Sequence, residues 1–367
     1  MASSNDLTIK DIRTHLMAIP FVEPPKVGFQ IRNERHFLFV EVETAGGIVG
    51  MGYLNPLGGG LRTLDTLIHE LLKPILLGRD ASHVEGLWRD MYRATYIQGR
   101  MGLPVMALSA LDIALWDILG KRADLPLYRL WGAVSDDLPI YGSGCFRGEG
   151  QDGMIAKAHR YVKQGFSAIK MQVAHVHTLN QDLDNVRAMR EALGEDVEIM
   201  IDVNQGWTAD QAIQMGRKFA DHNVYWLEEP VEANDFEGYR RIARAVPIRI
   251  AGGENHFTRF DFRPFFEDPC IPVLQPDVMR GGLTELRKIA AIADTWGLLI
   301  APHLFHELMA HVVGSIPNGM WLEYMGWHDD LWVEPVQPEK GRVRVPERPG
   351  HGLAVKPELL RDHPYRD

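Results

Sequence analysis

Three carboxylates close three successive apolar segments of the chain at a regular spacing. Asp202 ends IMID, Glu228 ends YWLE and Glu254 ends IAGGE, and each lies 26 residues from the next. One β/α unit has about this length, so the three side chains would meet at the mouth of a parallel barrel. Converging carboxylates repel one another, and a hard divalent ion such as Mg²⁺ accepts oxygen ligands of this kind. The spacing predicts a metal site, although a single acid could equally cap a helix N-terminus.

A histidine and an aspartate occupy the corresponding positions of two later segments. Asp277 follows VLQP and His303 follows LLIAP, again 26 residues apart. A carboxylate beside an imidazole fixes its tautomer and stabilises the imidazolium. A lone histidine at a strand end is more often structural, so the acid in the preceding segment is what favours a dyad with His303 as the base.

Positioning these side chains requires a repeated β/α architecture. After about residue 137, short apolar segments alternate with amphipathic stretches, which is typical of a parallel sheet. Eight expected strands with short connections favour a closed barrel, in which chemistry gathers at the carboxyl ends of the strands. The polar residues expected at these ends are Ser143, Lys170, Asp202, Glu228, Glu254, Asp277, His303 and Glu323.

The first 133 residues follow a different, α+β pattern. Strand-like alternation at 36–44 precedes helical sequence over 62–131. Residues 19–34 mix proline, glycine and charge, and are expected to form a long mobile loop. After about residue 330 the chain is rich in proline and glycine, and we expect it to return to the first domain instead of extending the barrel.

Composition excludes several classes of protein. With 46% hydrophobic and 24% charged residues the chain can bury a core. A net charge of −10 without a dense Lys/Arg run argues against nucleic acid. Cys145 and Cys270 are too far apart for a thiolate zinc motif. The N-terminus lacks a secretory pattern, and Asp112 and Asp117 interrupt the longest apolar segment, 104–120, so we expect a cytoplasmic protein without a membrane span.

Several motifs, in this order along the chain, resemble the enolase superfamily, and most closely its mandelate racemase-like subgroup. The resemblance extends from the N-terminal region nearly to the C-terminus, and it implies a modified TIM (β/α)7β barrel with an α+β capping domain. The motifs are IMIDVNQGW (199–207), YWLEEP (225–230), IAGGEN (250–255), LQPD (274–277), APHLFHE (301–307) and WLEYM (321–325).

The resemblance also implies limits for the domains. The capping domain would comprise residues 1–133, and loops near 19–34 and 52–60 would close over the barrel mouth. The catalytic barrel would comprise residues 134–328, and residues 329–367 would return to the capping domain.

Roles around a magnesium ion follow from the same resemblance. Asp202, Glu228 and Glu254 would be the metal ligands, and Glu229 would support them. Asn204 lies two residues beyond Asp202 and could support the metal site or the substrate.

The resemblance further implies how a substrate is held and deprotonated. Lys170 would help to bind the carboxylate that the metal also binds, and His303, oriented by Asp277, would remove the α-proton. Glu323 would donate a hydrogen bond to the substrate carboxylate, which requires a protonated acid; a solvated acid at the rim is the alternative. The remaining expected substrate contacts are Ser143, Gln172 and Asn204.

The second barrel strand departs from the subgroup's pattern. Mandelate racemase-like enzymes usually carry Lys-x-Lys there, whereas this chain has Lys170-Met171-Gln172. The second lysine of the pattern is the base on the face opposite the histidine, and glutamine has no titratable group. His175 and His177 follow in the loop, and one of them could substitute.

We therefore expect a Mg²⁺-dependent lyase that abstracts the α-proton of a hydroxy-carboxylate through a metal-stabilised enediolate. Dehydration of an acid sugar, an aldonate or aldarate, to a 2-keto-3-deoxy acid needs only the one base, His303. A racemase or epimerase ranks lower because Gln172 removes the second base. Cycloisomerisation ranks lower again, and a non-catalytic homologue remains the alternative from another class.

The sequence indicates less about substrate specificity and assembly than about the fold and the site. A small-molecule carboxylate is the expected partner, and the family tends toward homo-oligomers, dimers or octamers. Lys26, Arg32 and Arg35 could meet a distal carboxylate of a diacid, or they could be solvated.

Overall fold

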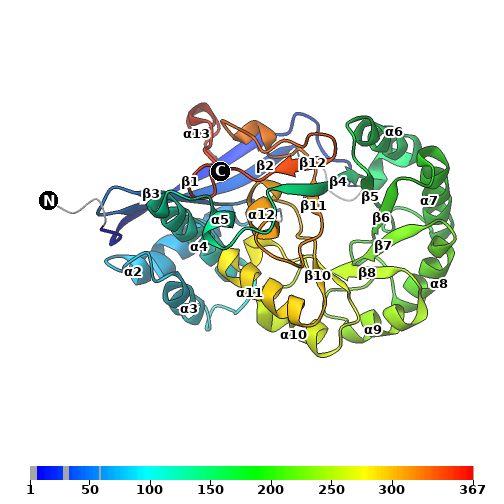
Figure 1. The fold of residues 1–367 in the computed structure, drawn as a ribbon, viewed down its shortest axis with the longest axis horizontal. Coiled ribbons are helices and arrows are strands. Elements are labelled where there is room, and N and C mark those ends of the chain that lie inside the picture. The colour runs from blue at the N-terminus through cyan, green and yellow to red at the C-terminus, as the bar shows by residue number, and fades with distance from the viewer. Residues whose placement is uncertain (1–5, 28–32, 58, 367) are drawn as a thin grey trace.

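The computed structural model describes residues 6–27, 33–57 and 59–366 of the chain. Figure 1 shows two regions side by side: an antiparallel sheet with helices at the N-terminal end, and a curled parallel sheet enclosed by helices. The predicted architecture, a modified TIM (β/α)7β barrel with an α+β cap, is confirmed.

The cap is built on three antiparallel strands in the order β1-β2-β3, with bounds β1 Ile9–Pro20, β2 Glu34–Thr44 and β3 Val49–Leu54. Strand β2 contains the alternation predicted for 36–44. The predicted loops 19–34 and 52–60 are shorter than expected, because residues 19–20 belong to β1 and residues 52–54 to β3. Residues 28–32 and 58 of these loops lie outside the described residues.

Helices follow the cap strands, as expected for 62–131. They are α1 (Leu61–Thr66), a π-helical turn (Leu67–Leu72), α2 (Lys73–Leu76), α3 (Val84–Ala94), α4 (Leu103–Ala123) and α5 (Leu127–Leu130). Helix α4 is long and apolar enough to cross a membrane by composition alone, but most of it is buried in the fold, as in the core helix of a globular domain.

Glycines on β3 allow α4 to lie directly on the sheet. A Cβ at Gly52 would approach the carbonyl oxygen of Ala110 to 1.9 Å, and one at Gly50 would approach that of Ala114 to 2.2 Å. Both distances are shorter than van der Waals contact, so only glycine fits. The Met51 amide between them donates a 2.9 Å hydrogen bond to the Asp117 carboxylate of α4. This close contact fixes the cap sheet against its central helix.

Eight parallel strands form the barrel, and seven helices, α6 to α12, alternate with them. The strands are β4 (Asp137–Cys145), β5 (Ala168–Gln172), β6 (Glu198–Asp202), β7 (Val224–Glu228), β8 (Arg249–Gly252), β9 (Val273–Leu274), β10 (Leu299–Ile300) and β11 (Leu322–Tyr324). The helices are α6 (Gly150–Lys163), α7 (Leu179–Leu193), α8 (Ala209–Ala220), α9 (Phe236–Ala245), α10 (Arg259–Glu267), α11 (Gly282–Thr295) and α12 (His306–Val313).

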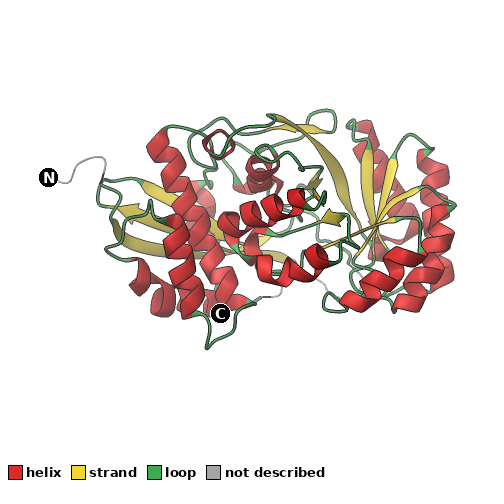
Figure 2. Ribbon diagram, turned by 60° about the horizontal axis from the view of Figure 1, so that its bottom comes forward, coloured by secondary structure: helices red, strands yellow, loops and turns green. Residues whose placement is uncertain are grey.

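Hydrogen bonds close the barrel between β10 and the segment just before β11. The sheet runs β10-β9-β8-β7-β6-β5-β4-β11. The Ile300 amide then donates to the Asn318 carbonyl at 2.9 Å, and the Met320 amide donates back to the Ile300 carbonyl at 2.8 Å. Figure 2 shows the helices on the outside of this curled sheet.

The barrel interior is filled by one layer of side chains directly below the predicted site. This layer consists of Tyr141, Ala168, Met200, Trp226, Ala251, Val273 and Ala301, all fully buried. Successive strand residues point to opposite faces, so residues two positions later point the same way. Four predicted site residues each lie two positions after a member of this layer: Lys170, Asp202, Glu228 and His303. The layer therefore supports the site from below.

The C-terminal segment contacts both regions. Strand β12 (Arg342–Arg344) pairs antiparallel with β4 of the barrel. Past helix α13 (Pro357–Asp362), the His363 carbonyl accepts from the Ala18 amide at 3.1 Å, and the Tyr365 amide donates to the Leu16 carbonyl at 2.8 Å. The limits at residues 133 and 328 stay a prediction.

Candidate active site

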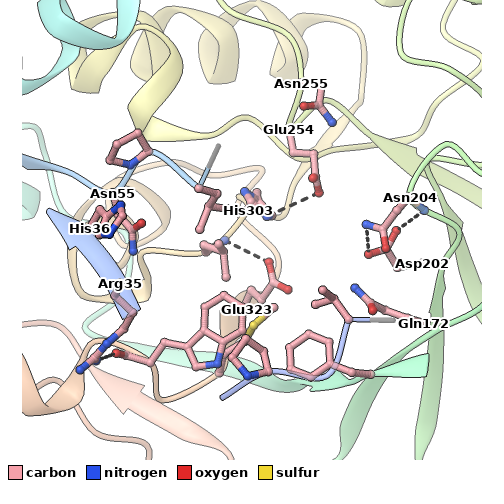
Figure 3. A pocket seen from close by; sticks show the side chains of 18 of the residues that line it. Arg35, His36, Asn55, Gln172, Asp202, Asn204, Glu254, Asn255, His303 and Glu323 are labelled. Carbon is pink, nitrogen blue, oxygen red and sulfur yellow. Dashed lines mark hydrogen bonds and ion pairs between the residues drawn. The ribbon is translucent and has the colours of Figure 1, made fainter. Parts of the chain in front are cut away.

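A cavity of about 980 Å³ lies between the barrel mouth and the cap. Its barrel side includes Lys170, Asp202 and His303, and its cap side includes Arg35 and Asn55. Figure 3 shows Asp202, Glu254, His303 and Glu323 around one pocket, with Arg35, His36 and Asn55 on the side opposite Asp202. The structure thus brings together side chains that the sequence placed at separate strand ends.

The three predicted metal ligands occupy adjacent positions at this mouth. Asp202 is the last residue of β6 and pairs in register with Glu228, the last residue of β7. Glu254 lies two residues after β8. Asp202 and Glu254 line the cavity, whereas Glu228 is fully buried and does not.

Internal contacts account for the position of Glu228. Its Oε1 lies 2.5 Å from the Lys170 ammonium, and its Oε2 accepts from Trp226 at 3.0 Å and Gln275 at 2.7 Å. Among the residues that the structure describes, no three His, Cys, Asp or Glu side chains are arranged to hold a metal ion. The triad is therefore adjacent but not gathered around one point in this conformation.

The charge of the triad nevertheless fits a divalent cation. Burial raises the pKa of Glu228 to about 8, opposed by the Lys170 ammonium and reinforced by Asp202. Burial also raises the pKa of Glu254; His303 opposes this shift, and Asp202 adds to it. Oxygen ligands that repel one another in this way are the donor set that Mg²⁺ takes.

His303 and Asp277 form the predicted dyad. His303 Nδ1 lies 3.0 Å from Asp277 Oδ2, while the other Asp277 oxygen accepts from the Met279 amide at 2.7 Å. His303 Nε2 faces the cavity and lies 3.6 Å from Glu254 Oε2. Burial alone would lower the pKa of His303, but Glu254 and Asp277 raise it to about 10. The Asp277 carboxylate can thus fix the tautomer and stabilise the imidazolium.

Glu323 differs from the role that the sequence suggested. Burial would raise its pKa, but Lys170, His303 and the Ser143 hydroxyl lower it to about 2. Its Oε1 lies 2.9 Å from the Lys170 ammonium and accepts from Ser143 at 2.7 Å, and its Oε2 accepts from the Leu304 amide at 3.0 Å. The structure therefore favours an ionised acceptor here, not the expected protonated donor. Ser143 is buried beneath it and does not line the cavity.

Gln172 occupies the position of the missing second lysine. It lines the cavity at the end of β5, in register with Asp202, and its Oε1 is buried without a hydrogen-bond partner among the described residues. The loop histidines that could replace that lysine lie elsewhere. His175 Nε2 contacts the Asn204 carbonyl at 2.9 Å, His177 Nδ1 lies 3.4 Å from Asp182, and neither lines the cavity.

Asn204 and Glu229 both line the cavity, and Asn204 contacts one of the triad carboxylates. Asn204 donates two hydrogen bonds to the Asp202 carboxylate, from its backbone N–H at 2.8 Å and from its side-chain Nδ2 at 2.6 Å. Glu229 accepts two contacts from the Asn255 side chain, at 2.9 and 3.0 Å, and one from Gln205 at 3.2 Å. Asn204 thus contacts a predicted metal ligand directly, whereas the supporting role of Glu229 stays a prediction.

Sequence reasoning missed several residues that hold the site. Gln275 and Trp226 fix Glu228, and Arg147 is buried and donates to the Asn204 side chain. Trp226 precedes Glu228 by two residues on one strand, so the period of a strand could have placed both on one face. Arg147 begins a short 3₁₀ helix after the first barrel strand, and no local pattern marks it.

A buried network joins the cap to the barrel beside the cavity. The Glu307 carboxylate of α12 accepts from the Tyr53 hydroxyl of β3 at 2.6 Å and contacts His328 Nδ1 at 3.1 Å. His328 Nε2 contacts the Asn55 side chain at 3.1 Å, and Asn55 lines the cavity. Burial would raise the pKa of Glu307, but His328 and its other partners lower it to about 2. No local sequence pattern indicates that Glu307 connects the cap and the barrel.

Comparison with known families matches both regions of the chain. Residues 11–132 match the mandelate racemase / muconate lactonizing enzyme N-terminal domain. Residues 153–359 match the enolase C-terminal domain-like family.

Similar proteins of known name align over nearly the full length. 3,6-Anhydro-α-L-galactonate cycloisomerase of Streptomyces coelicolor is 35% identical over 96% of this chain and 98% of its own. Arabinonate dehydratase of Saccharolobus solfataricus is 31% identical over 97% of this chain and 99% of its own. The crystal structure of L-talarate dehydratase from Polaromonas sp. JS666 complexed with Mg and L-glucarate superposes with a TM-score of 0.91, at 33% identity and 97% coverage of both chains.

Proposed function

The chain belongs to the mandelate racemase / muconate lactonizing enzyme family of the enolase superfamily, and from this premise we propose that it is a Mg²⁺-dependent lyase acting on an acid sugar. The reaction is removal of the α-proton of a hydroxy-carboxylate followed by loss of the β-oxygen, which yields a 2-keto-3-deoxy acid. The observation that carries the proposal is the His303–Asp277 dyad, which faces the cavity while Gln172 replaces the second base.

The carboxylate end of the substrate is held at the barrel mouth. Asp202, Glu228 and Glu254 would hold the ion, and when bound it supplies the positive charge that stabilises an enediolate. Lys170 would add a hydrogen-bond donor: its ammonium contacts Glu228 and Glu323, which leaves one of its three hydrogens for the substrate carboxylate. The side-chain oxygen of Gln172 is buried without a hydrogen-bond partner among the described residues. It would therefore favour a substrate hydroxyl that donates a hydrogen bond to it.

Proton transfer is assigned to His303. Glu254 does most to raise the pKa of His303, and a cation held by that carboxylate would offset this and leave the ring neutral. Nε2 of the neutral ring takes the α-proton, and the Asp277 carboxylate at Nδ1 holds the tautomer that leaves Nε2 free. The imidazolium can then protonate the departing β-oxygen on the same face of the substrate. Gln172 cannot exchange a proton on the opposite face. This asymmetry supports elimination over racemisation, which needs a base on each face.

The leaving group separates two versions of this elimination. In an open-chain aldonate the β-oxygen is a hydroxyl, and its loss releases water, as in the dehydratase relative's name. In a 3,6-anhydro sugar acid the β-oxygen is a ring ether, and its loss opens the ring without releasing water. The cycloisomerase relative favours this second version. Cycloisomerisation therefore ranks higher than the sequence alone suggested.

The remaining assignments complete the proposal. The domain limits are residues 1–133 for the cap, 134–328 for the barrel and 329–367 for the returning segment. We place the protein in the cytoplasm as a homo-oligomer, a dimer or octamer, with a small-molecule carboxylate as its partner.

A substrate screen tests the proposal. Aldonates, aldarates and 3,6-anhydro aldonates are incubated with the protein and Mg²⁺, and 2-keto acid formation is followed, with EDTA-treated protein as the control. We expect a 2-keto-3-deoxy product that depends on Mg²⁺. No product and no Cα deuterium exchange with any of these acids would overturn the proposal.

A further inference from the structure

We infer that the substrate is a monocarboxylate, because the described residues at the cap end of the cavity suit hydroxyl groups and not a second carboxylate. This inference rests on the proposed function and narrows its substrate class to aldonates and their anhydro forms. It concerns the side of the pocket that lies opposite Asp202 in Figure 3, where Arg35, His36 and Asn55 are found.

Arg35 is the cation at this end that a distal carboxylate would need, but its hydrogen-bond donors are already used. Nη1 donates to Asp330 Oδ1 at 2.6 Å, and Nη2 donates to Asp330 Oδ2 at 2.7 Å. Nη1 also donates to the Trp327 carbonyl, and Nη2 donates to the Pro20 carbonyl at 3.0 Å. The guanidinium has four Nη hydrogens, and these contacts occupy all of them. The buried Nε hydrogen alone has no partner among the described residues.

Asp330 also cancels the charge of Arg35. A two-pronged Arg–carboxylate pair is the strongest geometry such a pair can adopt, and the Arg35 side chain is only 4% exposed. A substrate carboxylate would have to displace Asp330 to gain the same contacts. The pair therefore presents no net positive charge to the cavity.

Other polar groups at this end suit hydroxyl groups. Asn55 and Asn33 are neutral, and Glu34 brings a negative charge, 3.7 Å from the His36 ring. An amide can both donate to and accept from a sugar hydroxyl, whereas a carboxylate near Glu34 meets a like charge. Burying a carboxylate without a cation or donors is costly.

Aromatic rings complete the wall. Phe146 stacks on Trp327 with ring centroids 5.7 Å apart, and Phe21 meets Trp327 edge-on at 5.6 Å. All three line the cavity. Aromatic faces of this kind pack against the C–H groups of a sugar chain, and their negative π-faces do not favour a carboxylate.

Besides Arg35 and His36, the basic residues in the described lining are Lys170, His303 and Arg280. Lys170 and His303 belong to the reaction centre. Arg280 donates to the Asn255 side chain at 3.3 Å and lies 5.0 Å from the centre of the Phe257 ring. Arg280 is the remaining candidate for a second carboxylate, so the experiment includes it.

Equilibrium binding tests the inference independently of turnover. The full chain carrying His303→Asn, which cannot consume the ligand, is titrated calorimetrically in Mg²⁺ with matched pairs such as D-galactonate and galactarate, or D-gluconate and D-glucarate. Each pair shares its internal stereochemistry and differs only at the far carbon. We expect every aldonate that binds to do so at least about ten-fold more tightly than its aldarate.

Two further variants, made in the His303→Asn protein, test whether the Arg35–Asp330 pair causes the preference for aldonates. Asp330→Asn keeps one acceptor for Arg35 but frees its charge, and should shift the aldarate-to-aldonate affinity ratio toward the aldarate by about ten-fold. Asp210→Asn breaks an exposed pair with Arg241 on the barrel's outer helices and should leave the ratio unchanged. A ratio that Asp330→Asn does not move would overturn the role given to Arg35.

The outcomes separate this inference from the proposed function. Aldarates that bind as tightly as aldonates overturn the inference, and loss of their binding in Arg280→Gln would place the second carboxylate at Arg280. Aldonate-selective binding without 2-keto acid formation by the wild type would support the inference and overturn the proposed lyase activity. Binding of neither class would overturn both.

Discussion

Asp277 Oδ2 lies 3.0 Å from His303 Nδ1, on the side of the imidazole away from the cavity carboxylate Glu254. The geometry joins two strand ends that are 26 residues apart in the sequence. It gives the imidazole one fixed partner and leaves Nε2 for a substrate.

Asp277→Asn should lower kcat by about 10²- to 10⁴-fold with little change in KM, because an amide that donates to Nδ1 forces the wrong tautomer. The Met279 amide keeps an oxygen acceptor, so the fold should persist. Steady-state kinetics measure the effect, with thermal unfolding and Mg²⁺ affinity as controls. An unchanged kcat would remove Asp277 from the mechanism.

Glu228→Gln should abolish turnover and weaken Mg²⁺ binding by at least about ten-fold, because it removes one negative ligand from the triad. Lys170 keeps Glu323 as a partner, so the fold should remain intact. The matched control is Glu229→Gln, which removes the charge of the adjacent carboxylate. Glu229 lines the cavity whereas Glu228 does not, so the comparison tests which of the two is the ligand. Calorimetric titration that finds the larger loss in Glu229→Gln would reassign the ligand.

Asp112 makes the stability of the fold depend on pH. It is fully buried in α4 and accepts from the Thr284 amide at 2.8 Å, and burial raises its pKa from 3.8 to about 7. A carboxyl whose pKa is raised by folding stabilises the fold when protonated. Its contribution is complete below pH 4 and is lost as the pH rises through 7.

Asp112→Asn should therefore flatten the fall in the free energy of unfolding between pH 4 and 7, by up to about 4 kcal/mol for a shift of this size. Urea titrations at several pH values measure it. Asp210→Asn, an exposed carboxylate, serves as control and should keep the wild-type slope. Parallel curves for wild type and Asp112→Asn would contradict the shift.

Tyr53→Phe should destabilise the protein by about 1–3 kcal/mol, because it leaves the buried Glu307 carboxylate without its 2.6 Å hydroxyl donor. Tyr239→Phe is the matched control. Tyr239 is equally buried, and its hydroxyl has no hydrogen-bond partner among the described residues, so its loss should cost little. Equal destabilisation by both variants would show that the Tyr53 hydroxyl contributes no specific contact.

The sequence predicted the barrel and the polar residues at its strand ends because both depend on local, repeated patterns. Strand-ending polar residues one β/α unit apart were enough to place Asp202, Glu228, Asp277 and His303 at one mouth. The two-residue period of a strand could also have identified Trp226 below Glu228.

Contacts between distant segments could not be predicted in the same way. Arg35 pairs with Asp330, 295 residues later, and Tyr53 pairs with Glu307, 254 residues later. The lowering of the Glu323 pKa depends on Lys170 and His303, which come from other parts of the barrel. Such charges and pairings are set by the assembled fold, and a linear pattern carries no sign of them.

Exchange of the α-proton in D₂O by His303→Asn tests the central claim, that His303 is the only base, most directly. Wild type should incorporate deuterium at Cα of one C2 epimer only, and the variant should incorporate none into either epimer, because Gln172 cannot take a proton. NMR follows the exchange with Mg²⁺ present. Residual exchange on either epimer by His303→Asn would reveal a second base and contradict the single-base elimination.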